Sequence, residues 1–307
     1  MKIQRYLQAS VAAAVATIVL KMTAWWVTDS VGLLSDALES LVNLVAALFA
    51  LWMVTVSLRP ADAGHPFGHG KAEYFSSGLE GLLILVAAGG ILVTAVQRLL
   101  HPVELETLGL GVVLSLVSSA INAGVAWMLI RASREHRSIA LEADGRHLMT
   151  DVYTSVGVVA GLLLVPLTGW HWLDPVLAIA VALNIAREGA SLLSRSADGL
   201  MDHALDETER REIERAIAEQ VRDSAPDGVR VDDLRTRRAG RLRFCELHLH
   251  VPEQWSVGRA MQLRQSIARA LIARVPGLRV TIELATVATE PLDANPGLGL
   301  GGVEEEG

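Results

Sequence analysis

Residues 30–51, SVGLLSDALESLVNLVAALFAL, form a long apolar segment that carries three polar residues near one end, Asp36, Glu39 and Asn43. Their spacing is +3 and then +4. Residues three and four apart lie on one face of an α-helix, so these side chains form a short polar stripe on an otherwise apolar rod. Such a stripe indicates a helix with a polar partner.

The matching partner lies at 141–162, LEADGRHLMTDVYTSVGVVAGL, where Asp144, His147 and Asp151 repeat the same spacing. Ionisable residues are costly inside a bilayer and usually mark a transport path or a partner pair. Oxygen and nitrogen ligands on two facing helices can close a tetrahedral shell around a cation of the Zn²⁺ kind. The predicted ligands are Glu39, Asn43, His147 and Asp151. The alternative is a hydrogen-bond network that joins the two helices.

Composition indicates a membrane protein with a soluble second part. The 307 residues are 51% hydrophobic and 20% charged, and the mean hydropathy is +0.37. Long apolar runs fill most of the first 200 residues, whereas 203–307 is charged. The single cysteine, Cys245, excludes a disulfide framework and a thiolate cluster. A net charge of −7 without a basic patch argues against nucleic-acid binding.

Apolar runs of about 20 residues are long enough to cross a lipid bilayer. Six such runs lie near 8–28, 32–56, 77–98, 107–131, 145–166 and 171–191. The first lacks a cleavage site, so we interpret it as a retained helix and not a signal peptide. Basic residues gather in the loops of one side: Lys2, Arg5, Arg59, Lys71, Arg131, Arg134, Arg137, Arg187 and Arg195. The positive-inside rule predicts that this side and both termini are cytoplasmic, in a multi-pass protein of the cell (inner) membrane.

The charged part has the periodicity of a small α+β domain. We predict helices at 204–221 and 256–275, strands at 229–237, 241–251 and 278–287, and a turn at Ala239-Gly240. The order α-β-β-α-β predicts a small sheet with two helices on one face. The predicted divisions are a transmembrane domain at 1–195, a linker at 196–205, a cytoplasmic domain at 206–288 and a disordered tail at 289–307.

Two further groups of residues could bind a metal. The loop RPADAGHPFGHGKAEY at 59–74 places Asp62, His65 and His69 within eight residues, and the alternative is a solvated loop with incidental histidines. Alternation along 241–251 places His248 and His250 opposite the apolar face. A tentative site there consists of Asp232, His248 and Glu283. A plain solvated sheet face explains these residues equally well.

The sequence contains no Gly-rich phosphate loop, no HExxH motif and no nucleophile beside a base, so it predicts no enzyme. Four stretches together resemble the cation diffusion facilitator family of the ferrous-iron and zinc efflux type. They are SVGLLSDALESLVN, HPFGHGKAE, HLMTD at 147–151 and DLRTR at 233–237. The resemblance extends to about Val287 and implies six transmembrane helices followed by a ferredoxin-like, metallochaperone-like domain.

The resemblance also implies ligands and partners. Family transport ligands fall on Glu39, Asn43, His147 and Asp151, and an interface site falls on Asp62, His65 and His69. In the common zinc and cadmium form the second-span pair is Asp or His followed by Asp, so Asn43 removes one negative charge. Such a site is expected to accommodate Mn²⁺, Fe²⁺ or Co²⁺ as well as Zn²⁺, Cd²⁺ or Ni²⁺, with no organic cofactor. Asp232, Met261, Glu283 and Ala285 stand where His or Asp is often found in the family, so its cytosolic site is expected to be altered here. The family forms homodimers, and Lys71 and Asp202 match a charge pair that stabilises them.

The resulting hypothesis is metal–proton antiport by alternating access. Ligands must lose protons to bind a metal, and an unperturbed imidazole titrates near pH ~6.5, so His147 is the expected coupling residue. A membrane metal sensor or scaffold that binds without transport is the main alternative, and an ion channel is a third.

Overall fold

The computed structural model describes residues 2–28, 31–100, 110–168, 172–224 and 228–289. Within these ranges, some side chains are not described: 2, 24–25, 27–28, 31–39, 42, 110–112, 114–115, 155, 157–168, 173–174 and 224. The tail predicted to be disordered lies outside the described residues, except for position 289. The chain divides into two compact units, Met1–Asp198 and Gly199–Gly307.

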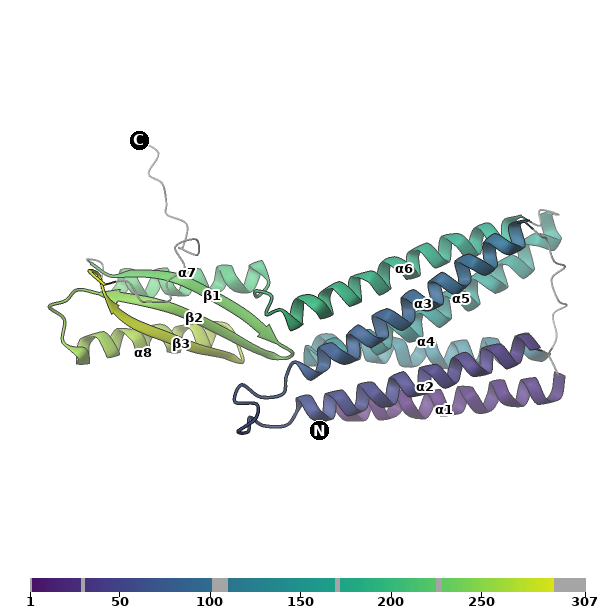
Figure 1. Cartoon of the computed structure of the whole chain (residues 1–307), viewed down its shortest axis with the longest axis horizontal. Coiled ribbons are helices and arrows are strands. Elements are labelled where there is room, and N and C mark those ends of the chain that lie inside the picture. Colours follow the sequence, from purple (N-terminus) through teal and green to yellow (C-terminus); the bar gives the residue numbers. More distant parts are fainter. Residues whose placement is uncertain (1, 29–30, 101–109, 169–171, 225–227, 290–307) are drawn as a thin grey trace. The chain divides into compact units, whose positions relative to one another are not determined.

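Long helices form the described part of the first unit (Figure 1). They are α1 (Lys2–Thr28), α2 (Val31–Ser57), α3 (Ala72–Leu100), α4 (Leu110–His136), α5 (Ile139–Thr168) and α6 (Leu173–Leu200). Four of them contain described stretches long and apolar enough to cross a membrane: Ile3–Thr23, Ala72–Leu100, Leu116–His136 and Pro175–Leu200. In α2 the described apolar stretch is shorter, Asn43–Ser57. The count of six spans therefore stays a prediction.

The helix α6 continues into the predicted linker. It runs to Leu200, so the first part of the linker expected at 196–205 is helical. The reason is that Ser196 is buried against α3, where its hydroxyl contacts the Ser77 hydroxyl at 3.0 Å and donates to the Tyr74 carbonyl. Tertiary packing thus extends the helix beyond its apolar run.

Small residues let the helices of the first unit approach closely. α1 packs on α2 and α4, and α5 contacts α2, α3 and α4. A Cβ atom added to Gly81 of α3 would lie 2.9 Å from the Leu193 nitrogen and 3.0 Å from the Gly189 carbonyl oxygen of α6. Backbone therefore meets backbone, as is typical of membrane helices with small residues at the interface. This contact determines which face of α3 is turned away from α6.

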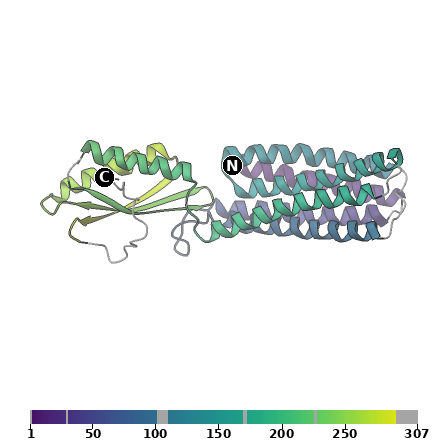
Figure 2. The ribbon, with the colours of Figure 1, turned by 90° about the horizontal axis from the view of Figure 1, so that it is seen from above.

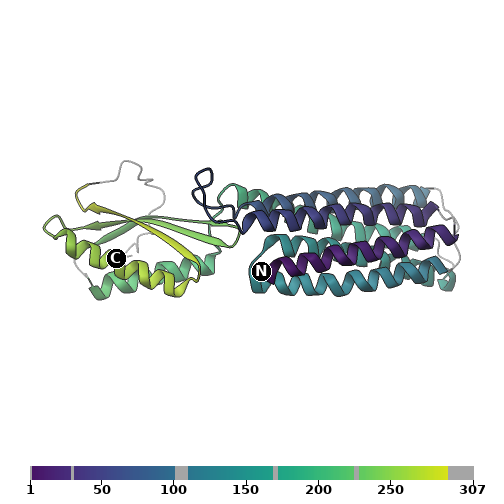
Figure 3. The same cartoon turned by 90° about the horizontal axis from the view of Figure 1, so that it is seen from below.

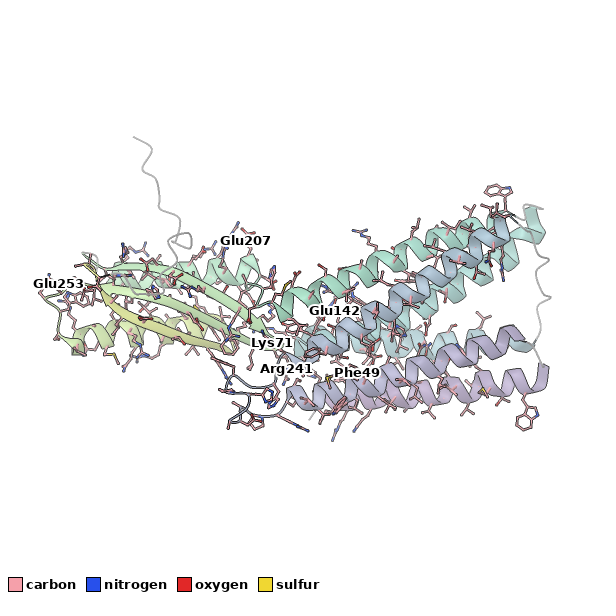
Figure 4. The ribbon with its side chains drawn as sticks, in the orientation of Figure 1. Phe49, Lys71, Glu142, Glu207, Arg241 and Glu253 are labelled. Atoms are coloured by element: carbon pink, nitrogen blue, oxygen red, sulfur yellow. The ribbon has the colours of Figure 1, made fainter. Side chains whose placement is uncertain are left out.

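Polar side chains join the helix ends. Glu73 of α3 is buried and accepts hydrogen bonds from Ser57 at 3.2 Å and Ser138 at 2.5 Å. Glu142 of α5, labelled in Figure 4, accepts from Arg146 at 3.0 Å and from Arg195 of α6 at 3.1 Å. These contacts connect α3 to the end of α2 and to the residue that precedes α5, and they connect α5 to α6.

The described part of the second unit has the predicted order of elements. They are α7 (Glu207–Ser224), β1 (Arg230–Ala239), β2 (Leu242–Val251), α8 (Val257–Arg274) and β3 (Leu278–Thr286). The strands lie in the order β1-β2-β3, with β1 antiparallel and β3 parallel to β2. Figures 2 and 3 show both helices on one face of the sheet, as expected. β1 reaches Ala239, so the hairpin turn is Gly240–Arg241, one residue later than predicted, with Gly240 at φ 58°.

The predicted strand alternation is confirmed by the core. Cys245, Leu247 and Leu249 of β2 face the helices and are buried with Ile213 of α7 and Ile267 of α8. Burial raises the pKa of the Cys245 thiol to about 12, so the thiol is inert in the folded protein. The opposite face of β2 is left for the polar residues.

An ion pair attaches α7 to the sheet. Arg243 is 3% exposed, donates to Glu209 at 2.5 Å and donates to the Pro276 carbonyl at 2.9 Å. Arg238 donates to the other Glu209 oxygen at 2.8 Å. Burial alone would raise the pKa of Glu209, but Arg243 and Arg238 outweigh it and hold the pKa below its ordinary value.

We expect Gly81→Ala to lower the melting temperature of the purified protein, because the added methyl group overlaps the α6 backbone. Overpacking of this kind costs roughly 1–3 kcal/mol. Gly90→Ala on the same helix is the control: its Cβ would have no atom within 4 Å, so the variant should melt at or above the wild-type temperature. Equal melting of both variants would contradict the close contact.

Glu209→Gln should lower the stability of residues 199–307 at pH 7 by about 1–3 kcal/mol, because Arg243 stays buried with its charge unmatched. A lowered folded-state pKa stabilises the protein above the unfolded value of about 4.3, and this contribution is lost as pH falls through the folded value. Urea unfolding between pH 7 and 3 tests both effects. The wild type should lose its advantage over the variant toward low pH, and a constant difference would argue against the ion pair.

Candidate metal centre

A polar cluster is built where α2 meets α5. The Asn43 Oδ1 atom lies 2.7 Å from His147 Nε2, and Asn43 Nδ2 donates to Asp151 Oδ2 at 2.6 Å. Asn43 and His147 are 8% and 6% exposed. The structure therefore brings together three of the four predicted transport ligands. The side chain of the fourth, Glu39, lies outside the described residues, as does that of Asp36.

Two further helices reach this cluster with residues that the sequence analysis missed. Asn122 of α4 is 4% exposed and donates to Asp151 Oδ2 at 3.3 Å. Glu80 of α3 is 1% exposed, and its Oε2 lies 3.7 Å from His147 Nδ1. A carboxylate inside the apolar run of α3 is itself a signal of function in a membrane helix, so Glu80 could have been found. The Asn122 amide carries no comparable signal.

Asp144 lies one turn before His147 on α5 and is 2% exposed. Its Oδ2 has no hydrogen-bond partner among the described residues. It is thus a buried carboxylate on the same helix as His147 and Asp151.

The loop residues form a second cluster. The Asp62 oxygens lie 3.4 Å from His65 Nδ1 and 3.5 Å from His69 Nε2, and the two imidazole centroids are 4.3 Å apart. Asp62 also accepts hydrogen bonds from the Gly64 and His65 backbone at 2.9 and 2.7 Å. The His65 N–H contributes most to holding the pKa of Asp62 below its ordinary value. Gly68, at φ 91°, allows the turn that returns His69 to the carboxylate.

On the second unit, a row of polar residues crosses the open face of the sheet. Asp232 pairs with His248 across β1 and β2, and His248 pairs with Glu283 across β2 and β3. His248 lies 3.6 Å from Asp232 and 3.9 Å from Glu283. The three residues of the tentative site therefore lie together, and His250 joins them through a 3.0 Å contact with Asp232.

A β-bulge adds Asp233 to this group. The register shifts between Asp232 and Arg235, and Asp233 adopts φ 48°, a left-handed conformation that Asp tolerates. As a result Asp233 Oδ2 lies 3.4 Å from His248 Nε2. Two consecutive residues, Asp232 and Asp233, therefore face the same imidazole. Strict alternation would have turned Asp233 to the other face, which is why the sequence analysis omitted it.

Arginines already neutralise part of this cluster. The Arg230 Nε lies 3.1 Å from Asp232 Oδ2, and Arg235 Nε donates to Asp233 Oδ1 at 2.9 Å. A metal bound by Asp232, His248 and His250, whose ligand atoms lie within 4.8 Å of one another, would compete with the Arg230 guanidinium. The cluster therefore combines metal-ligand geometry with a built-in positive charge.

The predicted dimer charge pair has one member in each unit. Asp202, at φ 61°, has its Oδ1 3.2 Å from Arg237 Nη1 in the second unit. Lys71, labelled in Figure 4, directly precedes α3 in the first unit. The pair stays a prediction.

Family models match both units. The model of the cation efflux transmembrane domain matches residues 7–201, and that of the cation efflux protein cytoplasmic domain matches 205–285. The chain belongs to the cation diffusion facilitator family. It is a cation-efflux transporter with a helical transmembrane domain and a C-terminal cytoplasmic domain, and its relatives are transporters, not enzymes.

Two relatives illustrate the match. The chain is 47% identical over 288 residues to an uncharacterized transporter of Synechocystis sp., covering 94% of this chain and 90% of that one. It is 32% identical over 275 residues to the cation-efflux pump FieF of Klebsiella pneumoniae, covering 89% of each. The metal-bound C-terminal domain of the CzcD transporter from Thermotoga maritima is 22% identical, with a TM-score of 0.24, covering 28% of this chain and 100% of that one.

We expect Arg230→Gln to raise the affinity of residues 199–307 for Zn²⁺ or Co²⁺ by about 10-fold, because it removes the charge that competes for Asp232. Calorimetric titration measures the change. Adding His250→Ala should abolish the gain, and Arg259→Gln, which removes an arginine that stacks on Trp255, is the control. An unchanged affinity in Arg230→Gln would show that the guanidinium does not compete with the metal.

Proposed function

We propose that this cation-efflux transporter exports a divalent metal ion from the cytoplasm in exchange for protons, through six spans and one intramembrane site. The observation that supports this is the direct contact of Asn43 with both His147 and Asp151 across α2 and α5. Glu39, one helical turn before Asn43, is proposed as the fourth ligand. A cation that replaces these hydrogen bonds would find nitrogen and oxygen ligands already gathered.

The contacts suggest how metal and protons exchange. His147 Nε2 carries a proton when it donates to Asn43 Oδ1, and it must release this proton before it can bind a cation. The metal would then draw on the same Nε2 atom, the Asn43 oxygen and the Asp151 carboxylate. When the site opens outward, protons return to His147 and to one carboxylate as the metal leaves. The inward proton gradient thereby drives export.

The proposed substrate is one or more of Zn²⁺, Fe²⁺, Mn²⁺, Co²⁺, Cd²⁺ and Ni²⁺. Asn43 supplies a neutral oxygen, and a site with fewer charges and more oxygen ligands is less restricted to Zn²⁺. Asn43 would thus set the ion preference.

The proposed orientation places both termini in the cytoplasm of a cell whose inner membrane holds the protein. Its support is the asymmetry of Lys and Arg between the two sets of loops. On this side the cluster of Asp62, His65 and His69 would be the first metal contact, and the sheet cluster would be a second cytosolic site. We further propose a homodimer in which the cytoplasmic domains meet and Lys71 and Asp202 form a charge pair.

In proteoliposomes with a pH gradient, the wild type should take up at least one of the six metals and release protons in return. Asp151→Ala should lower the rate by about 100-fold or more, because even residues that only support metal ligands contribute 10–100-fold. Asp198→Ala on α6 is the matched control and should transport normally. Asn43→Asp should shift the preference toward Zn²⁺.

Metal binding without flux in the wild type would contradict transport and favour a membrane metal sensor or scaffold. Conductance that neither saturates nor couples to protons would indicate a channel.

A further inference from the structure

Glu80 is a buried carboxylate that reaches the metal centre from a third helix. It is 1% exposed, and neither of its oxygens has a hydrogen-bond partner among the described residues. Its Oε2 lies 3.7 Å from His147 Nδ1. An ionised carboxylate without hydrogen bonds is costly in this environment unless a positive group faces it. The group that it faces belongs to the proposed metal centre.

Packing of α3 directs Glu80 toward α5. Gly81 lies against the α6 backbone and therefore fixes the rotation of α3 about its axis. Ile84, one turn after Glu80, is buried in a cluster with Ala143 of α5 and Ile185 of α6. Residues four apart share a helix face, so this cluster and Glu80 lie on the same side of α3.

The two nitrogens of His147 face different groups. Nε2 lies 2.7 Å from Asn43 Oδ1, on the side where Asp151 also contacts Asn43, whereas Nδ1 faces Glu80. An imidazole binds a metal ion with one nitrogen. A carboxylate at the other nitrogen accepts its N–H, orients the ring and raises the basicity of the ligand nitrogen. The geometry leaves Nε2 to the metal and Nδ1–H to Glu80.

Charge leads to the same assignment. The four proposed ligands, Glu39 included, offer two negative charges to a dication, because the Asn43 amide and the His147 imidazole are neutral. An ionised Glu80 would add a third negative charge in a water-poor environment, where such a charge acts strongly across the width of an imidazole ring. A carboxylate on α3 thereby replaces the charge that α2 lacks at Asn43.

We propose that Glu80 is a positioning residue of the transport site, which holds His147 through Nδ1–H and supplies the negative charge that Asn43 does not. This inference rests on the proposed function, since it assumes that His147 Nε2 binds the transported ion. Glu80 itself does not touch the ion. Its contribution is to the orientation of the imidazole and to the charge of the site.

The decisive experiment moves the charge from α3 back to α2. Zn²⁺ and Co²⁺ uptake by proteoliposomes is measured for the wild type, Glu80→Gln and the double variant Asn43→Asp/Glu80→Gln. Glu80→Gln keeps a hydrogen-bond acceptor but loses the charge, so its KM should rise 10–100-fold with a smaller change in kcat. The double variant should return the KM to within about threefold of the wild type, because the number of charges is restored.

Glu80→Ala removes the acceptor as well as the charge, so its KM should exceed that of Glu80→Gln. Glu73→Gln is the matched control, since Glu73 is an equally buried carboxylate on the same helix that contacts Ser57 and Ser138. It should lower the melting temperature and leave the KM unchanged. If Glu80 had only a packing role, Glu80→Gln would behave like Glu73→Gln, and adding Asn43→Asp would not change its KM toward the wild-type value.

A wild-type KM in Glu80→Gln, or a double variant as impaired as Glu80→Gln, would overturn the inference. If Glu80→Gln does not fold, Glu80→Asp carries the test: a KM between those of the wild type and Glu80→Ala supports the role, and equal KM values in all three overturn it. Asp151→Ala separates the two proposals. Normal transport by Asp151→Ala overturns the site itself, whereas loss in Asp151→Ala with none in Glu80→Gln overturns only the role of Glu80.

Discussion

The Asn43 amide joins the polar centre of the membrane unit, because it meets His147 with its oxygen and Asp151 with its nitrogen. Lipid offers no water to polar groups, so each must find its partner within the protein. One side chain that can accept and donate at the same time satisfies an imidazole and a carboxylate together. A metal ion bound as proposed would have to replace both contacts, so binding and release would exchange one complete set of partners for another.

Helical periodicity and the cost of polar groups in lipid were sufficient to predict the contact of α2 with α5. Asn43, His147 and Asp151 repeat at i and i+4 in apolar segments, and a polar stripe on one helix requires another to meet it. The α-β-β-α-β order was likewise predictable, since strand alternation and an amphipathic helix are local properties. The proximity of Asp62, His65 and His69 follows from a short loop with Gly68 at its turn.

The missed residues depend on features that periodicity does not contain. Glu80 and Asn122 do not belong to a repeated polar frame on their helices, and their proximity to His147 and Asp151 results from how α3 and α4 pack on the bundle. Asp233 was missed because a bulge interrupts the alternation of β1. The end of α6 at Leu200 was missed because burial of Ser196 against α3, and not apolar composition, extends the helix.

The close approach of α3 and α6 at Gly81 has a mechanical consequence. Backbone meets backbone at this point, so we expect α3 and α6 to move together, as one lever. Motion within the membrane unit would then occur where α3 meets α5, which is where Glu80 faces His147. Tilting the lever would lengthen or shorten that separation. By linkage, an ion held by His147 would in turn bias the lever toward one of its positions.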